Sequence, residues 1–145
     1  MSGLSYGSAD VTDISVIFSL CKALIDQYED IASIDYEKVL GWVRNKIESN
    51  ISKYICVYCE KDKVAYYCLN SQSDGWELDD LYVVAPYRGR GIGSQILSRC
   101  IEQTQGNLYL YVFKENLDAI RLYEKFGFTV KQSVGATRLI MHRCG

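Results

Sequence analysis

The sequence predicts an α/β fold: a single domain over residues 1–145, built on a mixed, mostly antiparallel sheet with a central β-α-β unit. Three observations support this prediction. A length of 145 residues is typical of one domain with its own hydrophobic core. Apolar residues recur at helical spacing up to about residue 49 and at strand spacing after it. From residue 76 onward, strand-like and helix-like segments alternate, as they do in β-α-β units.

Two helices and a hairpin are expected in the first half of the chain. Residues 11–28 carry one apolar stripe at helical spacing, made of Ile14, Ile17, Phe18, Cys21, Leu24, Ile25 and Tyr28. A second helix is expected from Tyr36 to about Ser49, because Asp35 can cap its N-terminus. Tyr54–Cys59 and Val64–Leu69 are rich in β-forming residues and flank a polar segment, which indicates a hairpin.

The second half alternates between the two periods. We expect strands at Trp76–Val84, Leu108–Phe113, Phe128–Ser133 and Arg138–His142, and helices at about Gly91–Gln103 and Leu117–Phe126. The first two of these strands and the helix between them form the β-α-β unit, and the last two strands form a closing hairpin.

The composition excludes several classes of protein. Apolar residues make up 48% of the chain and the formal net charge is -2, so a general nucleic-acid-binding protein is not expected. No apolar run approaches the roughly 20 residues that cross a bilayer, and the N-terminus lacks the pattern of a secretory signal. We therefore expect a cytoplasmic protein without a membrane partner.

The six cysteines do not predict a metal site. Cys56 and Cys59 form one C-x-x-C pair, whereas a structural zinc site needs four ligands and usually a second such pair. The cysteines lie within apolar segments, which favours free, buried thiols that behave as small hydrophobic residues. No metal is expected.

A glycine-rich loop follows the strand that ends near Val84. It reads Arg88-Gly89-Arg90-Gly91-Ile92-Gly93-Ser94 and leads directly into a helix. Glycines permit positive φ and close backbone approach, and the N–H groups of a helix N-terminus attract anions. Arginines add fixed charge that suits phosphate oxygens. The loop therefore predicts a phosphate cradle; the alternative is a tight turn that is glycine-rich for packing reasons alone.

The common phosphate motifs do not fit this loop. A P-loop needs a lysine after its last glycine, and none follows Gly93. The dinucleotide fingerprint needs G-x-G-x-x-G and an acidic residue at the end of the next strand, but that strand ends in Val112-Phe113-Lys114. A nucleotide-binding domain is therefore disfavoured.

Two motifs resemble those of the GCN5-related N-acetyltransferases (GNAT). "RGRGIG" fits the pattern Arg/Gln-x-x-Gly-x-Gly/Ala, and "NLDAIRLYEKFGF" (Asn116–Phe128) is similar to Asn-x-x-Ala-x-x-Leu-Tyr-x-x-x-Gly-Phe. Their order and separation match the family, and the resemblance covers nearly the whole chain, weakly before residue 76. It implies an acetyl-CoA-dependent N-acetyltransferase in which Arg88–Ser94 hold the pyrophosphate.

The resemblance also implies how the rest of acetyl-CoA is held. The pantetheine arm would pair with the main chain of Leu81, Tyr82 and Val83 and enter a gap between that strand and Leu108–Phe113. A main-chain N–H near these residues would polarise the acetyl carbonyl. Asn116 would bind the pantetheine or pyrophosphate region, and it can also cap the following helix.

The segment "WELDD" offers three carboxylates for a general base. Glu77 lies eleven residues before Arg88, the spacing of the catalytic glutamate in the histone-acetylating members of the family, so Glu77 is the expected base and Asp79 the second choice. Strand alternation predicts Glu77 and Asp79 on one face with Leu81 and Val83, and Asp80 on the other. The alternative is that these residues are solvent-facing charges at the start of a strand, and bulges in this strand could also swap the faces.

Tyr123 is the expected general acid. By resemblance, its hydroxyl gives a proton to the departing thiolate of coenzyme A. The alternative is an ordinary core tyrosine in a chain that has twelve of them.

The acceptor is expected to be a primary amine on a small molecule or a peptide. Acidic residues at Asp26, Glu29, Asp30, Asp35 and Glu37, together with those of "WELDD", could form a mouth for a cationic amine; the alternative is a solvated helix face. "ELDDLYV" is similar to aminoglycoside 6'-N-acetyltransferases, but Asp79 stands where they have histidine. Leu110-Tyr111-Val112 departs from the Leu-Glu-Val of acetylases of protein N-termini.

Two further questions stay open at this level. The same scaffold could be a non-catalytic module that senses acetyl-CoA or coenzyme A, although the presence of both Glu77 and Tyr123 favours the enzyme. The protein could be a monomer or a homodimer.

Overall fold

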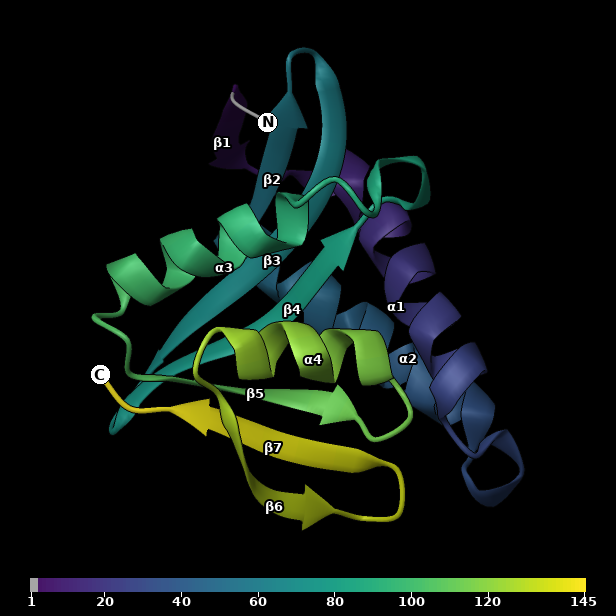
Figure 1. Ribbon diagram of the computed structural model, residues 1–145. Helices are drawn as coiled ribbons and strands as arrows, with labels where there is room; N and C mark the ends of the chain where they lie inside the picture. Colours follow the sequence, from purple (N-terminus) through teal and green to yellow (C-terminus); the bar gives the residue numbers. More distant parts are fainter. Residues whose placement is uncertain (1–2) are drawn as a thin grey trace.

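A computed structural model describes residues 3–145 as a seven-stranded sheet with helices on both faces (Figure 1). The strand order is β1-β2-β3-β4-β5-β7-β6, and all neighbouring strands are antiparallel except β4 and β5. The parallel pair is joined through α3, which makes the β-α-β unit. The α/β fold class with a mostly antiparallel sheet is confirmed.

The elements follow the expected order along the described chain. The strands are β1 (Leu4–Ser8), β2 (Tyr54–Cys59), β3 (Asp62–Gln72), β4 (Gly75–Val83), β5 (Leu108–Phe113), β6 (Thr129–Val134) and β7 (Arg138–Arg143). The helices are α1 (Ile14–Tyr28), α2 (Tyr36–Asn50), α3 (Ile92–Gln103) and α4 (Leu117–Lys125). β1 was not expected, because five residues with only two large apolar side chains give too short a pattern.

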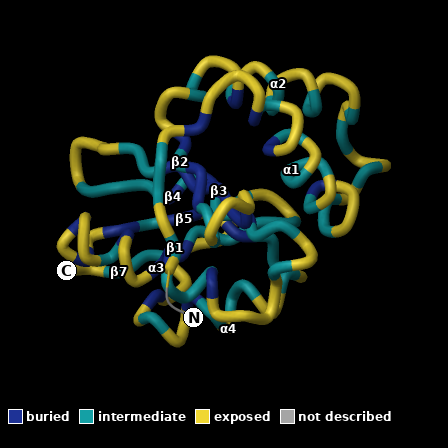
Figure 2. Tube along the Cα trace, turned by 90° about the horizontal axis from the view of Figure 1, so that it is seen from above, coloured by how far each residue is buried: buried dark blue, intermediate teal, exposed yellow. Residues whose placement is uncertain are grey.

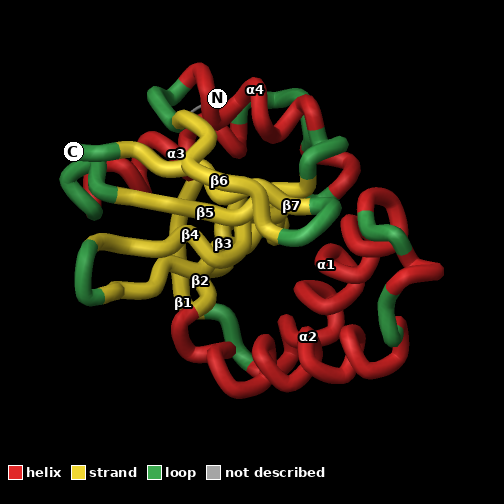
Figure 3. The backbone as a smooth tube through the Cα atoms, turned by 90° about the horizontal axis from the view of Figure 1, so that it is seen from below, coloured by secondary structure: helices red, strands yellow, loops and turns green. Residues whose placement is uncertain are grey.

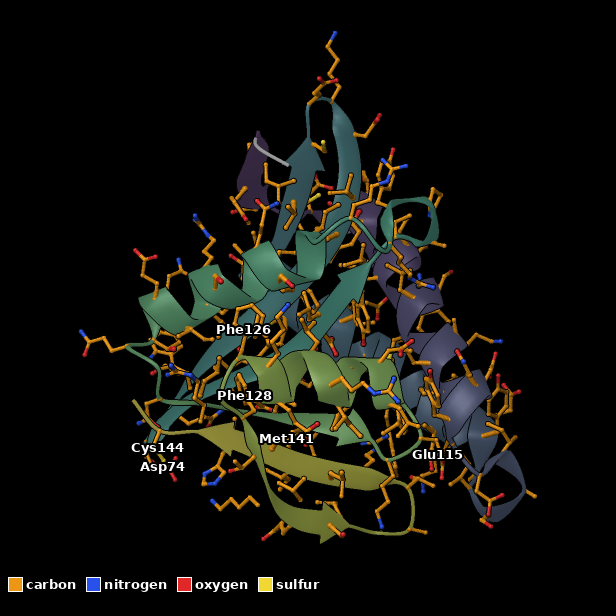
Figure 4. The ribbon with its side chains drawn as sticks, viewed as in Figure 1. Asp74, Glu115, Phe126, Phe128, Met141 and Cys144 are labelled. Carbon is orange, nitrogen blue, oxygen red and sulfur yellow. The ribbon has the colours of Figure 1, made fainter. Side chains whose placement is uncertain are left out.

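The helices divide into two layers, one on each face of the sheet. α3 and α4 cover one face, and α1 and α2 cover the other (Figure 3). Most of the buried backbone lies in the strands between these layers (Figure 2). Phe128 and Met141, which are at most 2% exposed, lie beneath α4 (Figure 4). Each layer therefore closes its own hydrophobic core against the sheet.

The cysteines behave partly as expected. Cys56, Cys68 and Cys100 are buried as free thiols, whereas Cys144 is exposed. Within residues 3–145, no three His, Cys, Asp or Glu side chains are grouped so that they could hold a metal ion. In the same part of the chain, no helix has the length and hydrophobicity to span a membrane.

Asp13 anchors the start of α1 to the sheet. Its side chain is nearly inaccessible to solvent and accepts hydrogen bonds from Lys63 Nζ at 2.8 Å and from the Tyr66 hydroxyl at 2.7 Å, both on β3. It also accepts from the main chain of Asp10 at 2.9 Å. Burial opposes the charge on Asp13, but the bonds from Lys63, Asp10 and Tyr66 outweigh it and lower the pKa of the carboxyl.

Asp13→Ala should destabilise the protein. The change leaves the buried Tyr66 hydroxyl without its acceptor, which should lower the free energy of unfolding by about 1–3 kcal/mol. Urea denaturation at pH 7 measures this loss. Asp26→Ala is the matched control, because Asp26 pairs with Lys22 at the exposed surface and should cost much less. Equal losses in the two variants would show that Asp13 does not anchor α1.

Candidate active site

The parallel strands β4 and β5 pair at only two positions. Trp76 lies beside Leu108 and Glu77 beside Tyr109, after which the strands diverge (Figure 1). A cavity of about 860 Å³ lies at this divergence, lined by residues of α1, α2, β4, β5 and α4. The gap expected between these two strands is therefore present, and it leads into the cavity.

Unpaired main-chain groups of β4 face this gap. Val84 N donates to Val64 O on β3 at 2.9 Å. Since main-chain direction alternates along a strand, we infer that the N–H and C=O groups of Val83 and Leu81 point away from β3 and that those of Tyr82 point toward it. The Tyr82 side chain is buried and bonds to Asp80. Of the three residues expected to hold pantetheine, Leu81 and Val83 thus offer main chain on the side of the gap, although the Val83 carbonyl already accepts a hydrogen bond from Arg88 Nε at 2.9 Å.

The predicted alternation along β4 is wrong, because the strand contains a bulge. Cys68 pairs with Asp80 and Leu69 with Leu78, so Asp79 has no partner in the register. As a result Leu78 packs in the same core as Leu81 and Val83, and Asp79 and Asp80 both contact Lys46 of α2. The extra residue in the bulge shifts the alternation of side chains between the two faces by one position. Both aspartates therefore lie on the face of the sheet that α1 and α2 cover.

Lys46 and two tyrosines compensate the aspartates. The ammonium of Lys46 lies 3.3 Å from an Asp79 oxygen and 3.2 Å from an Asp80 oxygen. Asp80 also accepts from the hydroxyls of Tyr54 and of Tyr82, the latter at 2.7 Å. Burial alone would lower the pKa of Lys46, but the two carboxylates outweigh it and raise the pKa, so the ammonium stays charged.

Glu77 is the uncompensated carboxylate of this strand. It lines the cavity, and among the described residues it has neither a hydrogen-bond partner nor an ion-pair partner. Burial, followed by repulsion from Asp79, raises the pKa of its carboxyl. The pKa of Asp79 is also raised, by burial and by Asp80, although Lys46 opposes the shift. Glu77 and Asp79 are thus both more basic than an ordinary carboxylate, and of the two only Asp79 contacts a cation among the described residues.

Tyr123 of α4 lines the same cavity. Its side chain is 9% exposed and packs against Phe128, with ring centroids 5.8 Å apart. Burial, with a smaller contribution from the charge of Asp80, raises the pKa of the Tyr123 hydroxyl to about 12. The phenol is therefore protonated at neutral pH and can donate a hydrogen bond into the cavity.

Asn116 caps α4, as expected. Its carboxamide oxygen accepts from the main-chain N–H of Ala119 at 3.4 Å and from the Tyr28 hydroxyl at 3.4 Å. The carboxamide NH₂ is then the group that could donate to a ligand. Asn116 also lines the cavity, so a capping role and a binding role are compatible.

The glycine loop has the backbone geometry of an anion site. Gly89 and Gly91 take φ values of 77° and 79°, and a Cβ at either position would meet nothing within 4 Å. Gly91 precedes the first turn of α3, whose first helical bond runs from Gln95 N to Gly91 O. The N–H groups of Ile92, Gly93 and Ser94 precede this bond in the first turn, so they have no acceptor within the helix.

These features fit a pyrophosphate. The first-turn N–H groups and the open surface over the glycines suit phosphate oxygens, although the Ile92 side chain itself is buried in the core. The Arg88 Nε donates to the Val83 carbonyl at 2.9 Å, and Arg90 lies over the Tyr87 ring. Arg88 lines the cavity, whereas residues 89–94 lie outside its lining. The loop and the cavity are thus adjoining parts of one site.

Sequence reasoning missed several contacts around the cavity. Glu29 accepts from the Thr137 hydroxyl at 2.5 Å and pairs with Arg138 at 3.5 Å, which joins the end of α1 to the β6–β7 hairpin. Tyr28 stacks on Phe113, with ring centroids 5.9 Å apart. Lys46 is the residue of the cavity whose position the sequence could have indicated, because it lies at helical spacing from Val39 and Val43 on the apolar stripe of α2.

The acidic mouth expected from the α1–α2 segment does not face the cavity. Asp26 bonds to Lys22 and Tyr36, Asp30 to Ser33, and Asp35 caps α2. The strand carboxylates Glu77, Asp79 and Asp80 line the cavity, but the acidic residues of 26–37 are not part of its lining.

Known proteins resemble this chain in sequence and in structure. The profile of the Acetyltransferase (GNAT) family matches residues 18–128. Spermine/spermidine N(1)-acetyltransferase of Bacillus subtilis (strain 168) is 32% identical over 121 residues, which cover 73% of this chain and 79% of that protein. Mycothiol acetyltransferase of Corynebacterium glutamicum (strain R) is 38% identical over 64 residues, 39% of this chain and 22% of that protein.

Solved structures share the fold over the full length. A PaiA N-acetyltransferase from Thermoplasma acidophilum, in complex with coenzyme A, has a TM-score of 0.75 at 18% identity and covers all of both chains. The ribosomal-protein-S18-alanine N-acetyltransferase from Escherichia coli has a TM-score of 0.67 at 19% identity, covering 96% of this chain and 92% of that chain. The motifs, the diverging strands and these matches agree: the chain belongs to the acetyltransferase (GNAT) family and is an acetyl-CoA-dependent N-acetyltransferase.

Proposed function

We propose that this protein transfers an acetyl group from acetyl-CoA to a primary amine of a small-molecule acceptor bound in the 860 Å³ cavity. One observation carries the proposal: an uncompensated carboxylate, Glu77, and a buried phenol, Tyr123, line the same cavity at the divergence of β4 and β5. Acetyl transfer to an amine needs a proton acceptor for the nitrogen and a hydrogen-bond donor for the leaving sulfur.

Residues of the glycine loop and of β4 would hold acetyl-CoA. The first-turn N–H groups of Ile92, Gly93 and Ser94, with Arg88 and Arg90, would bind its pyrophosphate. The main chain of Leu81 and Val83 would pair with its pantetheine arm in the gap, and Asn116 would donate to it from α4. Bound acetyl-CoA supplies the acetyl group as a thioester, whose carbon–sulfur bond breaks as the carbon–nitrogen bond of the amide forms.

Glu77 acts as the general base. An alkylammonium with a pKa near ~10.4 cannot attack a carbonyl until it loses a proton. The Glu77 carboxylate takes that proton, directly or through water, and releases it to solvent through the cavity. Asp79 is the second choice, but its charge is already paired with Lys46 at 3.3 Å.

Tyr123, the expected general acid, is proposed to act on the sulfur through a hydrogen bond. Its pKa of about 12 lies above that of an ordinary thiol, near ~8.5, so complete proton transfer to the thiolate is uphill. We therefore propose that the phenol stabilises the sulfur by a hydrogen bond as negative charge develops. The departing thiolate, with an ordinary thiol pKa near ~8.5, takes a proton from solvent at neutral pH, and the proton that the nitrogen loses on forming the amide goes to solvent, so these two protons balance.

The acceptor is proposed to be a small molecule rather than a peptide. The relative from Bacillus subtilis bears the name of a spermine and spermidine acetyltransferase, which supports a small amine. The Glu29–Arg138 pair and the Tyr28–Phe113 stack join the end of α1 to the β6–β7 hairpin and to β5 beside this cavity. A cytoplasmic location and a monomeric or homodimeric state stay predictions from the sequence.

A panel of amines tests the proposed function. Purified protein and acetyl-CoA should form N-acetyl product with at least one small primary alkylamine, and less with N-terminal or lysine peptides. Chromatography should detect the products, because a thiol-reactive dye would also label the protein's own six cysteines. Acetylation of peptides alone would contradict the small-molecule proposal, and tight coenzyme A binding without any acetylation would contradict the catalytic one.

Glu77→Gln should lower kcat/KM by about 100-fold or more at pH 7, because positioned general bases contribute on that scale. In the wild type, kcat/KM should fall as pH drops through the raised pKa of Glu77, at a higher pH than an ordinary glutamate would give. This fall of kcat/KM at low pH, the acidic limb of the pH profile, should disappear in Glu77→Gln. Asp79→Asn is the matched control and should keep the limb. If Asp79→Asn removes the limb instead, Asp79 is the base.

Gly91→Ala should weaken coenzyme A binding by about tenfold, because a residue with Cβ at a φ of 79° costs roughly 1–2 kcal/mol and moves the first turn of α3. Isothermal titration calorimetry measures this change. Gly135→Ala is the matched control, since Gly135 also has a positive φ, 61°, and open space around it, but lies in the β6–β7 turn. Both variants should lose similar stability; equal affinities for coenzyme A would exclude the loop as its site.

A further inference from the structure

The acceptor side of the cavity has an apolar wall opposite the carboxylates of β4. This wall is formed by side chains of α1 and α2 that line the cavity and keep partial exposure: Leu20, Leu24, Val39, Trp42 and Val43. Trp42 is 61% exposed, and the Lys38 ammonium lies over its ring, 5.2 Å from the centroid, so the indole already carries a cation. Exposed apolar surface in a concave site favours a ligand that can cover it.

The charges of the opposite wall are not equally available to a ligand. Asp80 is saturated by Lys46 and by the hydroxyls of Tyr54 and Tyr82. Asp79 shares the same ammonium at 3.3 Å. Glu77 alone lacks a partner among the described residues, so the wall offers one free negative charge.

A second ammonium on the acceptor would therefore meet carboxylates that are already paired. To reach Asp79 or Asp80 it would have to displace Lys46, which is tethered to α2, and Asp118 of the cavity lining is paired with Arg121 at 3.3 Å. The exchange replaces one cation by another and exposes the first, so it yields little net electrostatic gain. An uncharged alkyl or aryl group, in contrast, would cover the apolar wall without any such exchange.

We infer that the acceptor is a primary alkylamine or arylalkylamine with a single charged nitrogen, and that Lys46 is the residue that determines this preference. The inference rests on the proposed acetyl transfer in the same cavity. It predicts a departure from the relative named for spermine and spermidine, which are acceptors with several charged nitrogens. Lys46 touches the carboxylates rather than the reacting atoms and acts as a specificity-determining residue.

The test compares hexylamine with 1,6-diaminohexane, which have the same chain and differ only at the far end. In the wild type, kcat/KM for hexylamine should exceed that for the diamine by about tenfold or more, since an unpaired charge against an apolar wall is costly. Lys46→Met keeps the length of the side chain and removes its charge, which frees Asp79 and Asp80. This variant should shift the ratio toward the diamine by about tenfold or more. Lys46→Arg retains the charge and should keep the wild-type ratio.

A second variant covers the case in which Lys46→Met does not fold. Val39→Glu adds a carboxylate to the apolar wall without disturbing the Lys46 pairs, and it should also shift the ratio toward the diamine. Asn45→Glu is the matched control, because Asn45 is exposed on α2 and lies outside the cavity lining. A wild type that prefers the diamine, or an unchanged ratio in both Lys46→Met and Val39→Glu, would overturn the inference.

Direct binding separates this inference from the proposed function. Calorimetry with the Tyr123→Phe variant and coenzyme A measures the affinity for each amine without turnover. If no amine is acetylated by the wild type, the proposed function fails, but tighter binding of hexylamine than of the diamine still supports the inference. Equal binding, tighter binding of the diamine, or no binding of either amine contradicts it.

Discussion

The divergence of β4 from β5 is the constraint on which the rest of the site depends. The two strands pair beside Trp76 and Glu77 and then separate, so that main chain of Leu81 and Val83 is left without a neighbouring strand. Buried main-chain groups need hydrogen-bond partners, and an extended ligand arm can supply them. The same divergence opens the cavity between the two helical layers and lets residues of α2, β4, β5 and α4 line one space.

Three neighbouring carboxylates of β4 have different roles because of one bulge and one lysine. The bulge at Asp79 turns both aspartates toward α2, where Lys46 lies 3.3 Å from one and 3.2 Å from the other. Glu77, before the bulge, keeps a raised pKa, because burial and the charge of Asp79 outweigh the opposing charge of Lys46. The Lys46 pairs are only partly buried, and they leave Glu77 as the carboxylate of β4 without a contacting cation among the described residues.

The sequence was sufficient for the helices, the central strands and the glycine loop, since each follows from local periodicity or from a motif. It could not show β1, whose five residues form a stable strand only through pairing with β2. It also could not show the bulge, because strand alternation assumes an unbroken register with β3. The acidic residues of α1 and the following loop were expected at the acceptor, but their partners, such as Lys22 for Asp26, lie close by and hold them elsewhere. Lys46 and Arg138 reach the cavity only through tertiary packing.

A structure of the protein bound to coenzyme A is the most direct test of this site. The pyrophosphate should lie against the main-chain N–H groups of Ile92, Gly93 and Ser94. The pantetheine arm should pair with Leu81 and Val83, and the sulfur should lie within hydrogen-bonding distance of the Tyr123 hydroxyl. A pyrophosphate bound away from the start of α3, or a sulfur that does not enter the gap between β4 and β5, would contradict it.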